Sequence, residues 1–216
     1  FEAGQFSGTT KLSGTTTFLV GGVDEVSGKE AVAFNYDTKI NLDSSFTGED
    51  LLKTRIRAGN FNSTDPFGAS GASALEVASS TASALIIDRA YYQFPVGESM
   101  TATVGALVRQ DDMLGVWPSS YPTDSILDVM TYAGAPDTYN LSLGSGAGLS
   151  YEKDGFSASL AYIGTNGDDS SAGILTEDGA DDITAQVAYV KDGFGAAVAY
   201  TTSDEASGDY DAYALS

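Results

Sequence analysis

The stretch SFTGEDLLKTRIRAGNF, from Ser45 to Phe61, decides the fold prediction. From Leu51 onward its residues alternate between two kinds, as they do in a β-strand, where successive side chains point to opposite faces of the sheet. One set is Lys53, Arg55 and Arg57, and the other is Leu52, Thr54, Ile56 and Ala58. A soluble β-sandwich would turn the basic set to bulk water, whereas a membrane barrel would turn it into a water-filled lumen and give the apolar set to lipid. We follow the second interpretation along the chain.

The composition excludes several classes of function. No segment of the 216 residues approaches the ~20 consecutive apolar residues of a membrane helix, so any membrane span must be made of strands. The chain has no Cys and no His, which excludes disulfides, thiolate or imidazole metal sites and His-dependent nucleophilic catalysis. A net charge of −20 argues against nucleic acid as a partner. We therefore expect no cofactor, no metal and no catalytic residues.

The alternation predicts about ten antiparallel strands. Those with the clearest limits are 9–20, 31–42, the basic strand from Leu51, 84–94, 100–109, 139–151 and 156–162. Longer segments without a period separate some of them, namely 21–30, 62–83 and 110–138. Two details matter below. Asp88 falls on the apolar face, which requires a bulge or a position near the membrane interface, and Val108 and Tyr139 fall in apolar sets.

A repeat supports an up-and-down meander. The segment YEKDGFSASLAY, from Tyr151 to Tyr162, returns 38 residues later as YVKDGFGAAVAY. In each copy an Asp-Gly pair forms the expected hairpin turn. The aromatic residues predict two belts about 15 Å apart, closer than the usual ~25 Å of an outer-membrane barrel. The expected girdle consists of Tyr151, Phe156, Tyr162, Tyr189, Phe194 and Tyr200.

Two groups of residues are candidates for a pore. The expected pore-lining set, an electropositive wall, is Lys11, Lys39, Lys53, Arg55, Arg57, Arg89 and Arg109. The segment 110–138 is a candidate constriction loop that folds into the lumen, with Asp111, Asp112, Trp117, Asp124 and Asp128. The alternatives are a solvated sheet face that keeps its charge for solubility and an ordinary exposed acidic loop.

Several of these runs resemble a known family. FSGTTKLSG, SFTGEDLLKTRIRAGNF, LIIDRAYYQFPVGESMTATVGA and DDMLGVWPSSYPTDSILDVMTYAGAP are similar to the barrel domain of OprB-type porins in the form found in cyanobacterial outer membranes. The resemblance covers about residues 1–151. It implies a transmembrane barrel for passive diffusion of ions and small hydrophilic solutes, a homotrimer in outer-membrane lipid, and carbohydrates or iron species as solutes.

The resemblance also implies that this chain is part of a larger protein. Cyanobacterial members usually carry a surface-layer-homology segment and a coiled coil before the barrel, and neither is present here. We therefore expect residues 1–216 to be a single porin β-barrel domain that is incomplete, without its N-terminal wall-anchoring segment and its last strands. The competing hypotheses are a secreted β-sandwich that binds glycans or proteins and, with the least support, an outer-membrane enzyme.

Overall fold

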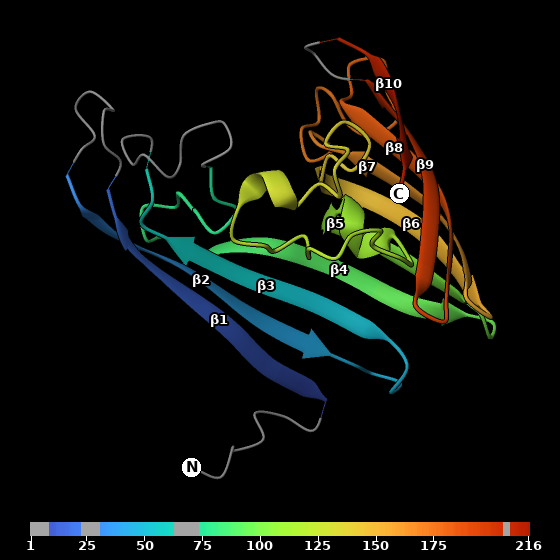
Figure 1. Cartoon of the computed structure of the whole chain (residues 1–216), viewed down its shortest axis with the longest axis horizontal. Coiled ribbons are helices and arrows are strands. Elements are labelled where there is room, and N and C mark those ends of the chain that lie inside the picture. The colour runs from blue at the N-terminus through green and yellow to red at the C-terminus, as the bar shows by residue number, and fades with distance from the viewer. Residues whose placement is uncertain (1–8, 23–30, 63–73, 205–207) are drawn as a thin grey trace.

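Ten antiparallel strands form one curved sheet in the computed structural model, which describes residues 9–22, 31–62, 74–204 and 208–216. The strands are β1 (Thr10–Gly21), β2 (Ala33–Ser44), β3 (Leu51–Gly59), β4 (Ile86–Val96), β5 (Met100–Arg109), β6 (Leu143–Lys153), β7 (Phe156–Gly164), β8 (Asp181–Lys191), β9 (Phe194–Asp204) and β10 (Tyr210–Leu215). Each strand pairs with its neighbours in the sequence, and β1 and β10 are the edges of an open sheet (Figure 1). The predicted all-β antiparallel meander is confirmed.

The part of the chain that the structure describes contains no helix long and apolar enough to cross a membrane.

Short turns and long loops alternate along the meander. The turns that join β6 to β7 and β8 to β9 have two residues each, and all four residues have positive φ: Asp154 (53°), Gly155 (88°), Asp192 (53°) and Gly193 (82°). Positive φ at both central residues is the turn geometry that matches the twist of a two-residue hairpin, so the two predicted Asp-Gly turns are confirmed. The loop between β5 and β6 and the described part of the loop between β3 and β4, residues 74–85, lie over the concave side of the sheet (Figure 1).

The sheet has an apolar outer face and a polar inner face. The outer face exposes large apolar side chains, among them Phe18, Val20, Phe34, Val104, Leu160, Val187 and Val198. The inner face, under the long loops, buries polar and charged side chains, among them Asn35, Asp37, Lys39, Arg55, Thr103, Ser159, Thr184, Gln186 and Thr201. A soluble domain would bury the first set and expose the second. All ten strands belong to one sheet, so the two packed sheets of the β-sandwich alternative are not formed by the described residues.

A β-bulge accommodates Asp88. The pairing of β3 with β4 shifts register between Arg55 and Ile56, which face Arg89 and Ile87, so that Asp88 has no partner residue. The extra residue lets Asp88 and Arg89 both turn inward, where they are 7% and 2% exposed. Strict alternation would have placed Asp88 on the apolar face, and of the two explanations that the sequence allowed, a bulge or an interface position, the structure has the bulge.

Two apolar residues were placed wrongly by simple alternation. Val108 was expected on the outer face, but β5 shifts register against β6 between Gly105 and Val108, and Val108 is fully buried with Tyr91 and Met113. Tyr139 was expected in the strand that ends at Tyr151, but that strand begins at Leu143. Tyr139 instead lies in the preceding loop and is fully buried. Parts of the predicted loops 21–30 and 62–83 lie outside the described residues.

Candidate pore constriction

All seven predicted pore-lining cations lie on the inner face, and six of them pair with a carboxylate. We call these six the basic wall. The closest contacts are Lys39 Nζ to Asp124 Oδ1 (2.9 Å), Lys53 Nζ to Asp43 Oδ1 (2.9 Å), Arg55 Nη2 to Asp88 Oδ2 (2.6 Å), Arg57 Nη2 to Asp37 Oδ2 (2.6 Å), Arg89 Nε to Asp112 Oδ2 (2.8 Å) and Arg109 Nε to Asp111 Oδ1 (2.6 Å). The seventh, Lys11, is exposed on β1, opposite Asp43 of β2.

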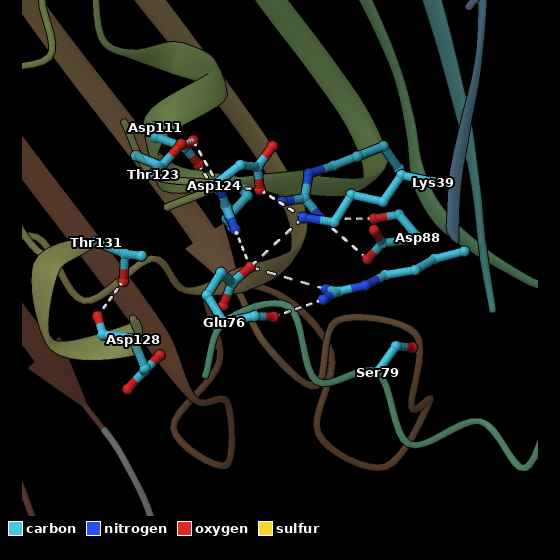
Figure 2. Close-up of polar contacts among 12 residues, drawn as sticks. Lys39, Glu76, Ser79, Asp88, Asp111, Thr123, Asp124, Asp128 and Thr131 are labelled. Carbon is cyan, nitrogen blue, oxygen red and sulfur yellow. Dashed lines mark hydrogen bonds and ion pairs between the residues drawn. The ribbon is translucent and has the colours of Figure 1, made fainter. Parts of the chain in front are cut away.

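Two carboxylates from different loops each contact three cations of the basic wall. Glu76, from the loop between β3 and β4, lies 3.5 Å from Arg109, 3.8 Å from Arg57 and 3.9 Å from Lys39. Asp124, from the loop between β5 and β6, pairs with Lys39 and lies 3.5 Å from Arg55 and 3.8 Å from Arg109. Figure 2 shows Glu76 and Asp124 reaching the same group of cations. The two loops are therefore held against one wall.

The same two loops also pair with each other through the backbone. Leu75 and Leu127 form an isolated β-bridge. The Glu76 N–H donates to the Ile126 carbonyl at 3.0 Å, and the Asp128 N–H donates to the Ala74 carbonyl at 3.0 Å. Glu76 and Asp124 thus approach the wall from one joined loop layer.

Burial and the surrounding cations shift the pKa of Glu76 and of Asp124 in opposite directions. Burial raises the pKa of Glu76 above its usual value, although Arg109, Arg57 and Lys39 oppose the shift. Burial also opposes ionisation of Asp124, but Lys39 and the nearby guanidinium groups outweigh it and lower the pKa of Asp124 to about 2. Asp124 is thus the more firmly charged of the two.

A short 3-10 helix, η2 (Gln110–Met113), places Asp111 and Asp112 directly on the wall. Asp111 accepts from Arg109 and from the Thr123 hydroxyl at 2.7 Å, while Asp112 accepts from Arg89 and from the Tyr91 hydroxyl at 3.1 Å. Burial opposes ionisation of both, yet the Arg109 hydrogen bonds lower the pKa of Asp111, whereas burial and the charge of Asp111 raise that of Asp112. Asp111 and Asp112 thus form direct ion pairs with Arg109 and Arg89, and no solvent-filled space separates the opposite charges.

The other candidate constriction residues lie beside this cluster. Trp117 packs edge-on against Tyr139 at a centroid distance of 5.2 Å and donates to the Tyr121 carbonyl at 3.0 Å. Asp128 begins the second 3-10 helix, η3 (Asp128–Met130), and accepts from the Tyr132 hydroxyl at 3.0 Å. Of the five predicted loop residues, the structure brings Asp111, Asp112 and Asp124 to the basic wall.

A polar cavity of about 300 Å³ lies between the wall and the loops. Its lining consists of Thr15, Lys39, Asn41, Lys53, Arg55, Arg89, Tyr91, Arg109, Asp111, Asp112, Thr123 and Asp124. The six wall cations face seven carboxylates, Asp37, Asp43, Glu76, Asp88, Asp111, Asp112 and Asp124, a formal excess of one negative charge. The charges are therefore locally compensated, in contrast to the uniformly electropositive wall that the strands alone suggest.

The predicted girdle residues lie along two levels of the later strands. Near the short turns, Tyr151 and Phe156 pack at 6.1 Å, Phe156 pairs across strands with Tyr189, and Phe194 is exposed. Near the long loops, the Tyr162 hydroxyl donates to Asp181 at 2.6 Å, and Tyr200 packs against Tyr213 at 5.0 Å. Their contact with lipid stays a prediction.

Sequence reasoning missed Glu76. It lies in the segment 62–83, which has no period and is rich in Ser, Ala and Gly. A signal was present: Glu76 stands between Leu75 and Val77 in a segment otherwise poor in large apolar residues. Such a triplet can anchor a loop, but it does not indicate which strands the carboxylate will reach.

The sheet, its polarity and the charged inner cluster define an all-β antiparallel meander with an inward-facing polar site. No known protein-family profile matches the chain. An uncharacterized protein of Synechocystis sp. is 28% identical over 195 residues, which cover 87% of this chain and 36% of that relative. An uncharacterized protein of Nostoc sp. is 36% identical over 107 residues, which cover 44% of this chain and 19% of that relative. The chain thus spans about a third or less of the relatives it matches.

Among solved structures, mutants of the porin of Rhodopseudomonas blastica are similar. One has 17% sequence identity and a TM-score of 0.49, and the match covers 89% of this chain and 63% of that chain. Another has 17% identity and a TM-score of 0.47 over the same shares.

Proposed function

We propose that this chain forms part of an outer-membrane porin, a water-filled channel through which ions and small hydrophilic solutes diffuse passively, with no chemical step. The observation that carries the proposal is the inverted polarity of the sheet. Phe18, Phe34 and Val198 are 69%, 66% and 58% exposed on the outer face, whereas Arg89 and Asp37 are each 2% exposed on the inner face. Lipid outside and water inside make both arrangements favourable.

Three further features support a channel. The alternation of short turns with long loops is the usual architecture of transmembrane barrels. The loop between β5 and β6 folds inward onto the wall through η2, where it narrows the space on the concave side. The aromatic residues at two levels of β6 to β9 suit the two membrane interfaces.

The finer proposals follow from the family resemblance. We propose an outer-membrane location in a cyanobacterium, assembly as a homotrimer, and a single barrel domain of which residues 1–216 are a part. The two relatives reported above come from cyanobacteria, which supports the source. We regard carbohydrates and iron species as candidate solutes. Of the two, carbohydrates have less support from the described cavity, because Tyr91 is the one aromatic side chain in its lining and a sugar ring finds little surface for stacking.

Alternate labelling of neighbouring residues tests the proposal. Asn41 lines the polar cavity and Ile40, the preceding residue of β2, belongs to the outer face. In proteoliposomes of the intact protein without other cysteines, Asn41→Cys should react with a small water-soluble thiol reagent and Ile40→Cys with a lipid-dissolved one. The opposite pattern, or water-soluble labelling of both, would contradict a lumen on the inner face.

A further inference from the structure

The polar cavity has more hydrogen-bond donors than acceptors in its lining. Five cations line it, Lys39, Lys53, Arg55, Arg89 and Arg109, against three carboxylates, Asp111, Asp112 and Asp124. The other four carboxylates that pair with the basic wall, Asp37, Asp43, Glu76 and Asp88, are outside this lining. Although the whole cluster is nearly neutral, the surface that faces the cavity is positive.

Two of the cavity cations have unused donors. Arg89 is 2% exposed, and its Nη2 atom is buried with no hydrogen-bond partner among the described residues. Burying a donor without a partner is unfavourable, so an acceptor bound there would be favoured. Lys53 has three N–H donors and, in the described chain, one carboxylate within ion-pair distance, Asp43.

The remaining lining groups suit a small oxyanion. The hydroxyl of Thr15 and the amide of Asn41 supply further neutral donors around the same space. A volume of about 300 Å³ admits an ion of the size of phosphate together with water.

We propose that this cavity is a binding site for a small inorganic oxyanion of the phosphate class, held by Arg89 and Lys53 at the inner wall. The proposal rests on the porin function, for which it names a class of solute and a resting position along the path. Fixed charges in a pore slow a preferred ion when they bind it and raise its local concentration. The protein would therefore bind phosphate at low concentration and pass it at a rate that saturates.

The test is calorimetric titration of the intact, detergent-extracted protein with inorganic phosphate at low ionic strength, where screening is weak. Lys53→Gln removes a cavity donor on β3, and the matched control Lys191→Gln makes the same change at the exposed end of β8, which does not line the cavity. Because Lys53 is partly exposed, we expect its loss to weaken phosphate binding about three- to tenfold. Lys191→Gln should leave the affinity unchanged.

A second variant changes the affinity in the opposite direction. Asp124→Asn removes one of the three carboxylates in the lining and should tighten phosphate binding, an effect that loosening of its loop would not produce. Equal effects of Lys53→Gln and Lys191→Gln, weaker binding in Asp124→Asn, or no binding of phosphate at all would overturn the site.

Bilayer currents of the same preparation separate this proposal from the porin function. Open channels whose protein does not bind phosphate would overturn the oxyanion site and leave the porin standing. Phosphate binding that depends on Lys53, in a protein that opens no channels, would support the site and overturn the porin.

Discussion

Replacement of Arg57 by Gln should destabilise the protein far more than the same replacement of Lys53, four residues away in the same strand, β3. Arg57 holds Asp37 through two hydrogen bonds, Nε to Oδ1 at 3.1 Å and Nη2 to Oδ2 at 2.6 Å. The Asp37 side chain is 1% exposed and that of Arg57 is 14% exposed, so Arg57→Gln leaves a buried carboxylate without its cation.

The expected magnitudes differ because the burial differs. Breaking a buried ion pair by removing one partner costs about 3–5 kcal/mol. Lys53 and Asp43 have side chains that are 20% and 28% exposed, and for such a partly solvated pair we expect a loss of about 1 kcal/mol or less. The double variant Arg57→Gln, Asp37→Asn removes both charges, and most of the stability lost in Arg57→Gln should return.

Urea unfolding in detergent, followed by circular dichroism, measures these differences. The midpoint should fall most for Arg57→Gln, recover in the double variant, and change little for Lys53→Gln. If Arg57→Gln lost no more stability than Lys53→Gln, or if the double variant were as unstable as Arg57→Gln, the buried ion pair between Arg57 and Asp37 would not be the source of the expected stability difference.

Three further predictions concern the channel. Replacing Arg55 and Arg57 by Gln leaves Asp88 and Asp37 without their main cations, so the reversal potential under a salt gradient should shift toward cation preference in the channels that assemble, while Lys191→Gln should not shift it. Cations lower the pKa of Asp124 from 3.8 to about 2. The ion pairs between Asp124 and the basic wall should therefore be intact above pH 3.8 and lost as the pH falls toward 2. A single-channel conductance that changed only well above pH 3.8 would contradict this assignment. A Cβ at Gly148 would lie 2.7 Å from Met113 Cβ, so Gly148→Ala should displace η2 and change the conductance, whereas at Gly195 the nearest atom is 3.6 Å away and Gly195→Ala should have no effect.

The strands could be predicted because each carries its own signal. Alternation and the repeated Asp-Gly turns depend on neighbouring residues, and both appear in the structure with strand ends displaced by a few residues. The bulge at Asp88 was also indicated, because a carboxylate on the apolar face is unfavourable unless a bulge turns it inward or it lies near the membrane interface. The register shift before Val108 had no such signal, since an apolar residue fits an outer face as well as a buried cluster.

The charges of the site could be predicted only in part. The strand pattern places Arg55 and Arg57 on one side, but it cannot show that Asp37 and Asp88 meet them across strands at 2.6 Å. The contacts of Glu76 are harder still to predict, because its position depends on a loop-to-loop pairing with Ile126, 50 residues along the chain. Side-chain partners set by such long-range contacts decide the net field of the wall.

The single-channel current of the intact protein in a planar bilayer tests the central claim most directly. An inner face that is polar and an outer face that meets lipid predict discrete, ohmic steps of current in a salt solution. A well-folded, detergent-extracted protein that inserts into the bilayer and gives no such steps would contradict a water-filled lumen.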